Sequence, residues 1–398
     1  MILFQKTGQK EEIERMYKMK IKYVIFIFIC SFLLSGCTHD MNRREIDEIN
    51  FIHVMGLDYS EGDYIITVIY SSSQGADPEK GSTGEEETSK ARGATPYEAY
   101  ENLKLKNKKS ISIANTGYFL IGERACEKGI NICIDFLSKD ETTKMDSLLF
   151  VIKGKDASEF IKESMEGKQI VHEDLEAVEQ KQQELVTRND NTLVNIMNEI
   201  ENDMTSVIIP YLISEEKAFL IKGYAVFDKL KLADYLDMET STGVNFIKNI
   251  VREFPIYLKD DVSLSIAYTN TSLKSELDDD TIKVVINVDF ETMVKEVITD
   301  EDIFNKNALE SLTNKQNEYI MEVIKKAVNY SIYHGRDILQ VARLIENQHT
   351  SRWSEYEEDW EELVSEIQYE LVINSKIAKS FMLSKQRQYD EIKQLKNQ

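Results

Sequence analysis

Two runs of alternating apolar residues constrain the fold of this chain more than any other feature. Apolar side chains occupy every second position in residues 262–268 and again, over a longer stretch, in residues 282–290. A period of two is the pattern of a strand that buries one face. The apolar positions of residues 309–332 then recur with helical spacing, and residues 367–373 alternate once more. This order predicts a sheet covered by helices on one face.

The residues before these runs alternate shorter strands with helices, which is typical of an α/β domain. Thr95 is expected to cap a helix, with Pro96 in its first turn and Glu98 completing a capping box. Asp156 and Glu159 predict the start of another helix that ends near residue 163. The other expected strands cover residues 51–57, 64–71, 118–121, 147–152, 207–213 and 219–227, and the other expected helices cover 123–137, 173–201, 234–249, 338–345 and 353–364.

We therefore expect a multi-domain body of the α+β or α/β class, with mixed sheets covered by helices, behind a lipoprotein signal peptide. The polar, Gly-rich residues 73–93 predict a mobile loop. The predicted organisation is a signal peptide (1–36), a lipid-anchored tether (37–50), an N-terminal α/β domain containing the loop (51–203), a middle domain (204–260) and a C-terminal α/β domain (261–398).

The leader ends in Leu34-Ser35-Gly36-Cys37, behind an apolar run that follows three lysines. The run spans about half of the roughly 20 residues that a helix needs to cross a bilayer. We interpret it as a bacterial lipoprotein signal, cleaved between Gly36 and Cys37, with a diacylglycerol on the sulfur of Cys37 and an acyl group on its nitrogen. The alternatives are a retained membrane anchor and an ordinary signal peptide with a coincidental cysteine. The acidic residues near the start are unusual in front of a signal peptide, so Met16 and Met19 are candidate start residues besides Met1.

Charge restricts the partners of the body. Removing the leader's six basic and three acidic residues leaves 42 basic and 67 acidic residues. Nucleic-acid binding requires a basic surface, so this balance argues against it. It also argues against an electrostatic hold on anionic lipid, and the predicted membrane anchor is therefore covalent.

Sequence motifs for catalysis are absent: there is no GxSxG, HExxH, CxxC or phosphate-binding glycine loop. The histidines have no carboxylate or second histidine at a strong ligand spacing, and we expect them to be surface or locally bonded side chains. They are His39, His53, His172, His334 and His349. We accordingly predict no enzyme activity, no metal site and no cofactor.

Three smaller patterns have both a structural and a functional interpretation. Trp353 and Trp360, seven residues apart on an expected helix, could form a binding platform, but core packing is favoured. Cys126 and Cys133 would lie about 10.5 Å apart on a continuous helix, beyond the reach of a disulfide, so we expect two core residues. The acidic residues 278–280 predict a hairpin turn, because further calcium ligands at EF-hand spacing are missing.

Fragments spread over the whole mature chain resemble the Ger(x)C lipoprotein family, the C subunits of spore nutrient germinant receptors. Each fragment is weak alone, but their order behind the lipoprotein signal makes the resemblance specific. They are Arg43-Arg44-Glu45-Ile46, HVMGLD at 53–58, ATPYEA at 94–99, LIGE at 120–123 with Ala125, DFL at 135–137 with Asp140, KGYAVF at 222–227 with Lys229-Leu230, Tyr235-Leu236, Glu239-Thr240 with Gly243, Gly335 with Asp337-Ile338, and Trp353 with Trp360. Thr38-His39 replaces the family's Trp-Asp after the lipid cysteine, and its arginine-rich closing tail is missing.

The resemblance implies a three-domain lipoprotein on the outer face of the spore's inner membrane. It implies assembly with a multi-spanning A subunit and a permease-like B subunit, a part in nutrient-triggered germination, and no catalysis. A solute-binding lipoprotein of an importer is the main alternative, because it shares the anchor, the size and the α/β body. A tethered hydrolase is a third possibility, which would require a nucleophile and a base to meet in the fold.

Overall fold

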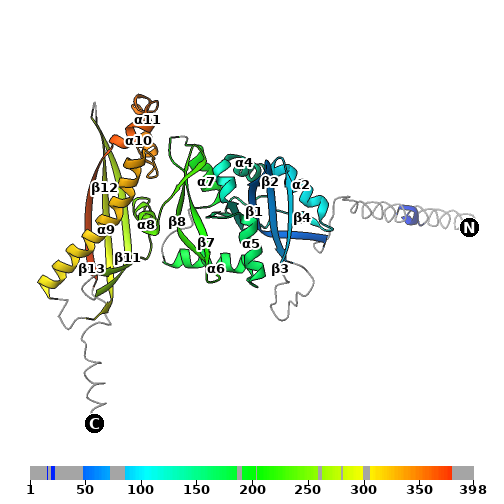
Figure 1. Cartoon of the computed structure of the whole chain (residues 1–398), viewed down its shortest axis with the longest axis horizontal. Helices are drawn as coiled ribbons and strands as arrows, with labels where there is room; N and C mark the ends of the chain where they lie inside the picture. Colours follow the sequence, from blue (N-terminus) through cyan, green and yellow to red (C-terminus); the bar gives the residue numbers. More distant parts are fainter. Residues whose placement is uncertain are drawn as a thin grey trace, which may run out of the picture. The chain divides into compact units, whose positions relative to one another are not determined.

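The computed structural model describes residues 16, 19–22, 48–71, 86–185, 191–202, 204–258, 262–278, 281–298 and 305–378. The chain divides into two compact units, Met1–Glu48 and Ile49–Gln398, and the second contains all of the strands described below (Figure 1). None of the helices in the described part of the chain combines the length and the apolar character needed to cross a bilayer. The predicted lipid site at Cys37, with Gly36 and the signal sequence around them, lies outside the described residues.

A mixed sheet of nine strands forms the centre of the first half of this unit. Its strand order is β3-β2-β1-β5-β6-β7-β8-β9, and β4 pairs with the start of β1. The pairs β1–β5, β5–β6 and β6–β7 are parallel, and the outer pairs are antiparallel. The strands are β1 (Ile49–Ser60), β2 (Asp63–Ser71), β3 (Glu86–Gly93), β4 (Ser110–Ser112), β5 (Tyr118–Gly122), β6 (Leu148–Ile152), β7 (Ile208–Glu215), β8 (Ala218–Asp228) and β9 (Lys231–Tyr235).

Part of the predicted loop at residues 73–93 is a strand, and the loop prediction is wrong there. Residues 86–93 form β3, which pairs antiparallel with β2 from Tyr64↔Gly93 to Ser71↔Glu86. Half of the residues of this edge strand are exposed and only one is buried, so its polar composition resembles that of a loop. Residues 72–85 lie outside the described part of the chain.

Helices cover both faces of this sheet and bury a separate apolar cluster on each. Four helices cover one face: α2 (Pro96–Lys106), α3 (Glu123–Lys128), α4 (Asn131–Lys139) and α7 (Leu193–Ile200). Two helices cover the other face: α5 (Ala157–Glu166) and α6 (Val171–Leu185). Thr95 caps α2 as predicted, accepting a hydrogen bond from the backbone N–H of Glu98, whose carboxylate accepts one from Ala94. The predicted α/β character of this segment is confirmed.

Two long helices expected in this half are each divided. A break at Gly129 separates α3 from α4, and the expected helix at 173–201 consists of the end of α6 and all of α7. Gly129 has a φ of +127°, a conformation that L residues rarely adopt and that ends α3. Cys126 and Cys133 therefore lie on different helices, both fully buried and unbridged, so their prediction as core residues is confirmed although the assumed continuous helix is wrong.

The second half contains a four-stranded sheet in the order β10-β11-β12-β13. Its strands are β10 (Pro255–Leu258), β11 (Val262–Asp278), β12 (Thr281–Val297) and β13 (Gln368–Ala378). Asp278 pairs with Thr281, which confirms the predicted hairpin, although residues 279 and 280 are not described. The chain then forms α9 (Lys306–His334), α10 (Val341–Gln348), two 3₁₀ turns (Trp353–Glu355 and Val364–Glu366) and α11 (Trp360–Leu363), and returns as β13, parallel to β12. The predicted sheet with its helical cover is confirmed.

Residues 204–260 contribute to both halves. Their strands β7 to β9 continue the first sheet, whereas α8 (Met238–Ile247) packs into the core of the second half. Because β9 occupies residues 231–235, the helix expected from residue 234 begins only at Met238, where the side chain of Asp237 caps it. The first sheet is thus continuous across residue 203, and the three-domain division remains a prediction.

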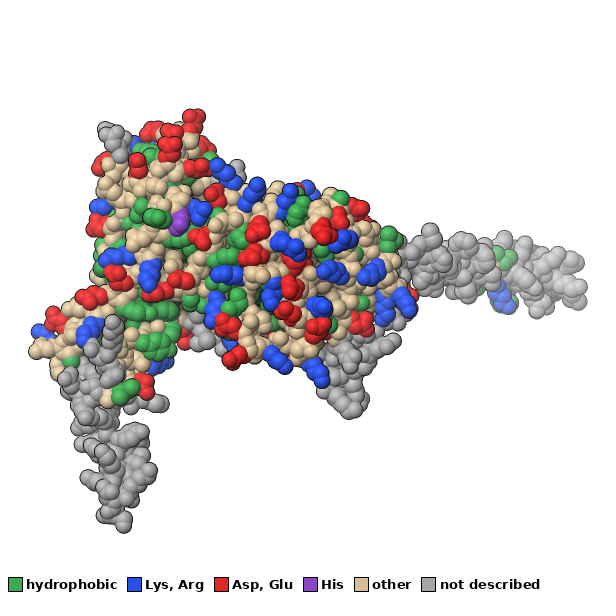
Figure 2. Space-filling view, in the orientation of Figure 1, with side chains coloured by type: hydrophobic (Ala, Val, Ile, Leu, Met, Phe, Trp, Pro, Cys, Tyr) green, Lys and Arg blue, Asp and Glu red, His purple; other side chains and the backbone are tan. Residues whose placement is uncertain are grey.

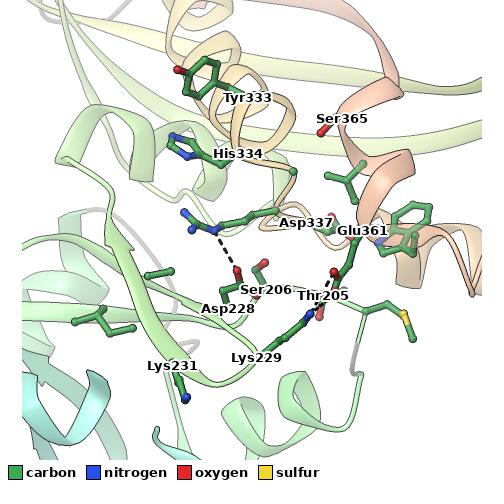
Figure 3. A pocket seen from close by; sticks show the side chains of 17 residues that line it. Thr205, Ser206, Asp228, Lys229, Lys231, Tyr333, His334, Asp337, Glu361 and Ser365 are labelled. Atoms are coloured by element: carbon green, nitrogen blue, oxygen red, sulfur yellow. Dashed lines mark hydrogen bonds and ion pairs between the residues drawn. The ribbon is translucent and has the colours of Figure 1, made fainter. Parts of the chain in front are cut away.

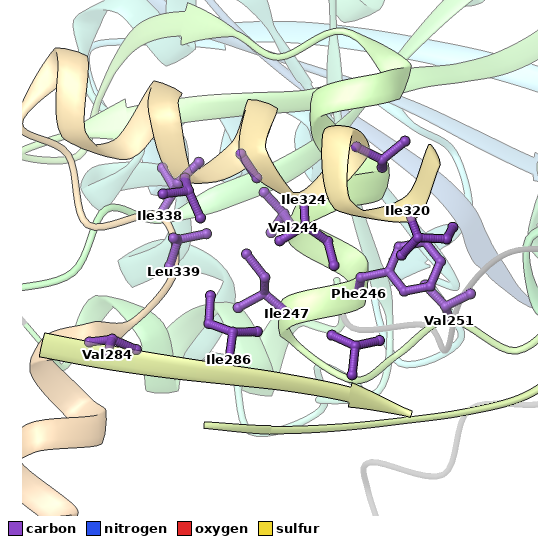
Figure 4. Close-up of a cluster of buried hydrophobic side chains, with 14 of the residues drawn as sticks. Val244, Phe246, Ile247, Val251, Val284, Ile286, Ile320, Ile324, Ile338 and Leu339 are labelled. Atoms are coloured by element: carbon purple, nitrogen blue, oxygen red, sulfur yellow. The ribbon is translucent and has the colours of Figure 1, made fainter. Parts of the chain in front are cut away.

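The helix α8 lies between β12 and α9 in the second core (Figure 4). Val244 and Ile247 of α8 lie near Ile324 of α9 and Ile286 of β12. Gly243 allows the close approach of α8 and α9, because a Cβ at this position would overlap the backbone oxygen of Val323.

We expect Gly243→Ala to lower the free energy of unfolding by about 1–3 kcal/mol, the usual cost of forcing extra volume into a packed core. Urea unfolding followed by circular dichroism measures this change. Gly117→Ala is the matched control, since a Cβ there would meet only the backbone oxygen of His53, at 4.0 Å. Equal effects of the two substitutions would contradict the proposed tight contact.

Candidate functional site

A groove of about 830 Å3 lies where the β8–β9 turn meets the helices of the second half (Figure 3). The turn provides one wall, the end of α9 and residues 335–337 after it provide the opposite wall, and α11 closes one end. Segments that resemble the Ger(x)C family converge here from distant parts of the sequence. They contribute Lys229, Gly335, Asp337 and Trp360 to the lining.

The β8–β9 turn adopts a backbone conformation that its residues do not favour. Lys229 and Leu230 have φ values of +47° and +63°, and Asp228 pairs with Lys231 on either side of them. Two consecutive positive φ angles in a two-residue hairpin indicate a type I′ turn, which usually contains Asn and Gly. The turn is held from outside, because the carbonyl of Leu230 accepts a 2.9 Å hydrogen bond from the backbone N–H of Ile130.

Two ion pairs cross the groove from the turn to the helices. Lys229 Nζ lies 2.9 Å from Glu361 Oε1, and Arg336 Nε lies 3.8 Å from Asp228 Oδ2. The first pair is exposed, so water screens it and it contributes little to stability. The guanidinium of Arg336 also donates to the Tyr330 hydroxyl at 3.2 Å. These contacts hold the two walls together loosely, which suits a surface that can rearrange around a partner.

Asp337 is a buried carboxylate at the base of the groove. Its two oxygens accept 2.8 Å hydrogen bonds from the backbone N–H groups of Val341 and Ala342, so it caps α10 from outside the helix. Burial raises its pKa to about 6, although these N–H donors oppose the shift. The indole of Trp360 also lowers the pKa of Asp337, although its N–H does not form a well-aligned hydrogen bond. Because residues 338–340 form the turn closed by this cap, α10 begins at Val341, three residues later than expected.

The two tryptophans pack against each other in the core. Trp360 is 1% exposed, and its ring centroid lies 5.4 Å from that of Trp353 in an edge-to-face arrangement. The preferred interpretation as core packing is therefore confirmed. The expected continuous helix is wrong, because Trp353 begins a 3₁₀ turn and Trp360 begins α11.

Each of the described histidines has a local partner, and two of them stack on each other. His334 lies in the groove and stacks on Tyr330, with ring centroids 4.4 Å apart, and His349 Nε2 lies 3.0 Å from the backbone oxygen of Ser275. His53 and His172, from different elements, stack on each other with ring centroids 5.0 Å apart. His39 lies outside the described residues.

The stacked pair extends to a carboxylate that sequence spacing does not reveal. Glu86, at the start of β3, accepts a 2.6 Å hydrogen bond from Nδ1 of His172 and further hydrogen bonds from the N–H groups of Val171 and His172 at the start of α6. The hydrogen bond to Glu86 raises the pKa of His172, and burial followed by the neighbouring His172 lowers the pKa of His53. The expectation that these histidines lack a carboxylate or a second histidine is wrong, because Glu86 belongs to the segment predicted as a loop.

This cluster also contains a contact between a hydroxyl and a base. Ser71 Oγ lies 3.1 Å from His53 Nε2. In a catalytic triad the carboxylate orients the histidine that activates the nucleophile. Here the carboxylate of Glu86 contacts His172 instead, so the arrangement differs from a triad. Among the described residues, no group of three or more His, Cys, Asp or Glu side chains is placed to hold a metal ion.

The fold is that of a multi-domain α/β protein with mixed sheets covered by helices. Residues 42–214 match the family model described as Spore germination protein N-terminal domain, and residues 222–380 match Spore germination B3/GerAC like, C-terminal. The chain therefore belongs to the Ger(x)C family of spore germination proteins.

Two individual proteins support this assignment. Spore germination protein A3 of Bacillus subtilis (strain 168) is 23% identical over 291 residues, which cover 70% of this chain and 74% of the relative. The crystal structure of the GerBC protein has a similar fold, with a TM-score of 0.53 and 15% sequence identity, over 81% of this chain and 96% of that chain.

The pKa of Asp337 leads to a testable dependence of stability on pH. Because the folded pKa lies above the ordinary aspartate value of 3.8, this group stabilises the fold fully below about pH 4, and the contribution is lost as pH rises through about 6. We therefore expect the parent chain to lose about 1 kcal/mol more unfolding free energy between pH 5 and pH 7 than Asp337→Asn does. Urea unfolding at the two pH values measures this, and the exposed Asp146→Asn serves as control. Parallel pH profiles for the parent and Asp337→Asn would refute the assignment.

Proposed function

We propose that this chain is the lipid-anchored C subunit of a spore nutrient germinant receptor. It would be attached to the outer face of the spore's inner membrane through Cys37 and would act by assembly with the integral A and B subunits, without catalysis. The observation that carries the proposal is the pair of family matches, which follow one another along residues 42–214 and 222–380. This match favours a receptor subunit over a solute-binding lipoprotein of an importer.

The lipid anchor gives such a subunit a physical role. A protein confined to a membrane surface meets integral partners at a much higher effective concentration than a free one. A single acyl chain holds a protein only marginally, with a binding constant of about 10⁴ M⁻¹, whereas several chains hold it firmly. The diacylglycerol and the N-acyl group expected on Cys37 would together provide that firm hold.

The groove supports an assembly role through the aromatic side chain at its edge. Tyr333 is 86% exposed and extends from the last turn of α9 beside His334. Large aromatic side chains are enriched at the centres of protein interfaces, where they contribute much of the binding energy. We propose that this groove contacts another subunit of the receptor.

Replacing the lipid-bearing cysteine tests the anchor. We expect Cys37→Ala to move the protein from the membrane fraction to the soluble fraction and to weaken nutrient-triggered germination, since no thiol remains for acylation. Fractionation of spore lysates, followed by immunoblotting, measures the distribution. Cys133→Ala, which changes a buried thiol of α4, should leave the distribution unchanged. Retention of Cys37→Ala in the membrane fraction would overturn the anchor.

Removing the exposed ring tests the groove. We expect Tyr333→Ala to leave the thermal midpoint nearly unchanged, because the ring is exposed, but to reduce co-purification with the integral subunits at least tenfold. An interface hot spot of about 2 kcal/mol has an effect of this size. Tyr257→Ala, whose ring is 70% exposed on β10, is the control. Equal recovery of the complex with both variants would exclude Tyr333 from the interface.

A further inference from the structure

The point at which the tether enters the folded body lies beside a short basic segment. The first residues of β1 pair in parallel with β4, in the register Ile49↔Ser110 to Phe51↔Ser112. The residues that lead into β4 form the end of α2 and the turn after it (Figure 1). Cys37 precedes Ile49 by twelve residues, which span at most about 40 Å when fully extended. A lipid on Cys37 therefore keeps this end of the body within reach of the membrane.

The basic segment contrasts with the acidic chain around it. Residues 104–109 read KLKNKK and contain four lysines and no acidic residue. Lys104, Lys106 and Lys108 are exposed, and Lys109 is half-buried. Leu105 stands among them with 84% of its surface in solvent. Basic and acidic side chains are intermixed over much of the face that Figure 2 shows.

Local contacts account for part of this segment. Lys104 pairs with Glu101 and lies over the ring of Tyr100, and Lys106 donates a 2.9 Å hydrogen bond to the backbone oxygen of Lys90. Lysines in the last turn of a helix also interact favourably with its dipole. These effects explain Lys104 and Lys106. They do not explain Lys108, which follows the end of α2 and is exposed, nor the exposed leucine between two cations.

Several carboxylates lie near the segment. Glu101 is paired with Lys104, Asp135 and Asp140 line the same hollow as Lys104, and Glu87 bonds to Tyr70, whose hydroxyl donates to Asn107. Residues 104–109 themselves contain three exposed lysines and no carboxylate. An exposed ion pair such as that of Lys104 with Glu101 is weak enough to exchange for a lipid phosphate.

We propose that residues 104–109 form a second membrane contact, in which the lysines bind the anionic headgroups of phospholipids and Leu105 enters the interface between headgroups and acyl chains. The net acidic charge of the chain does not prevent this contact, because electrostatic forces are screened beyond about 8 Å at physiological ionic strength. Only charges near the bilayer count, and residues 104–109 contribute four positive charges and no negative charge. The proposal relies on the proposed lipid anchor only to bring the segment to the membrane.

The experiment uses residues 38–398 without the leader and without the lipid cysteine, which retains the whole compact unit. Binding is measured by co-sedimentation with vesicles of equal parts phosphatidylglycerol and phosphatidylcholine, and with vesicles of phosphatidylcholine alone. We expect at least tenfold stronger partitioning to the anionic vesicles in 50 mM salt. We expect most of this preference to disappear in 300 mM salt, a test that needs no variant.

The combined variant Lys104→Glu, Lys106→Glu and Lys108→Glu should abolish this preference. Each lysine near an anionic surface raises partitioning about fivefold, so removing three corresponds to a loss of roughly 100-fold. The matched control combines Lys295→Glu, Lys306→Glu and Lys325→Glu, which changes the net charge equally at exposed positions of β12 and α9. The control should bind like the parent, and Leu105→Ser should weaken binding without removing its salt dependence.

Three outcomes would overturn the proposal. The parent could show no preference for anionic vesicles, or the two triple variants could lose binding equally. The α2 variant could also bind vesicles normally yet fail to co-purify with the receptor subunits, which would assign the surface to a protein partner. None of these results concerns acylation, because the chain used has no lipid cysteine. Failure of the anchor would appear separately, in the fractionation of Cys37→Ala.

Discussion

The architecture depends on carboxylates that satisfy the first backbone N–H groups of helices to which they do not belong. Asp58 of β1 accepts hydrogen bonds from Ala157 and Ser158 at the start of α5, at 2.6 and 2.9 Å. Glu86 does the same for α6, and Asp337 for α10. The first N–H groups of a helix have no partner within it, and leaving them buried and unpaired is costly. Each carboxylate therefore determines where a helix can pack.

These caps link separate layers of the structure. Asp58 joins β1 of the first sheet to α5, and Gly122 of β5 allows the contact because a Cβ there would overlap the aspartate oxygen. Burying a carboxylate is costly as well, and burial raises the pKa of Asp58, like that of Asp337, to about 6. Glu86 behaves differently: although burial opposes the change, its hydrogen bonds with His172 lower its pKa. The same kind of cap is thus compatible with a raised pKa at Asp58 and Asp337 and with a lowered pKa at Glu86.

The groove and the basic end of α2 would place two kinds of contact on one body. The groove combines loosely paired charges with an exposed aromatic ring, a composition suited to a protein partner. The segment 104–109 combines lysines with one exposed leucine beside the start of β1, a composition suited to an anionic surface. An anchor at Cys37, a surface contact at α2 and a groove contact would together restrict how the subunit can turn at the membrane.

The sequence by itself determined the elements whose periodicity is strong. It predicted β11, β12, the long α9, the Thr95 cap and the hairpin at residue 278, because alternation and capping are local and appear directly in neighbouring residues. Only the tertiary structure decided that polar residues 86–93 form an edge strand and that Asp58, rather than Asp156, caps α5, since Asp156 instead pairs with Arg124. It also brought Lys229, Asp337 and Trp360 to one groove. Those outcomes depend on contacts between residues about 20 to more than 100 positions apart, which no local pattern encodes.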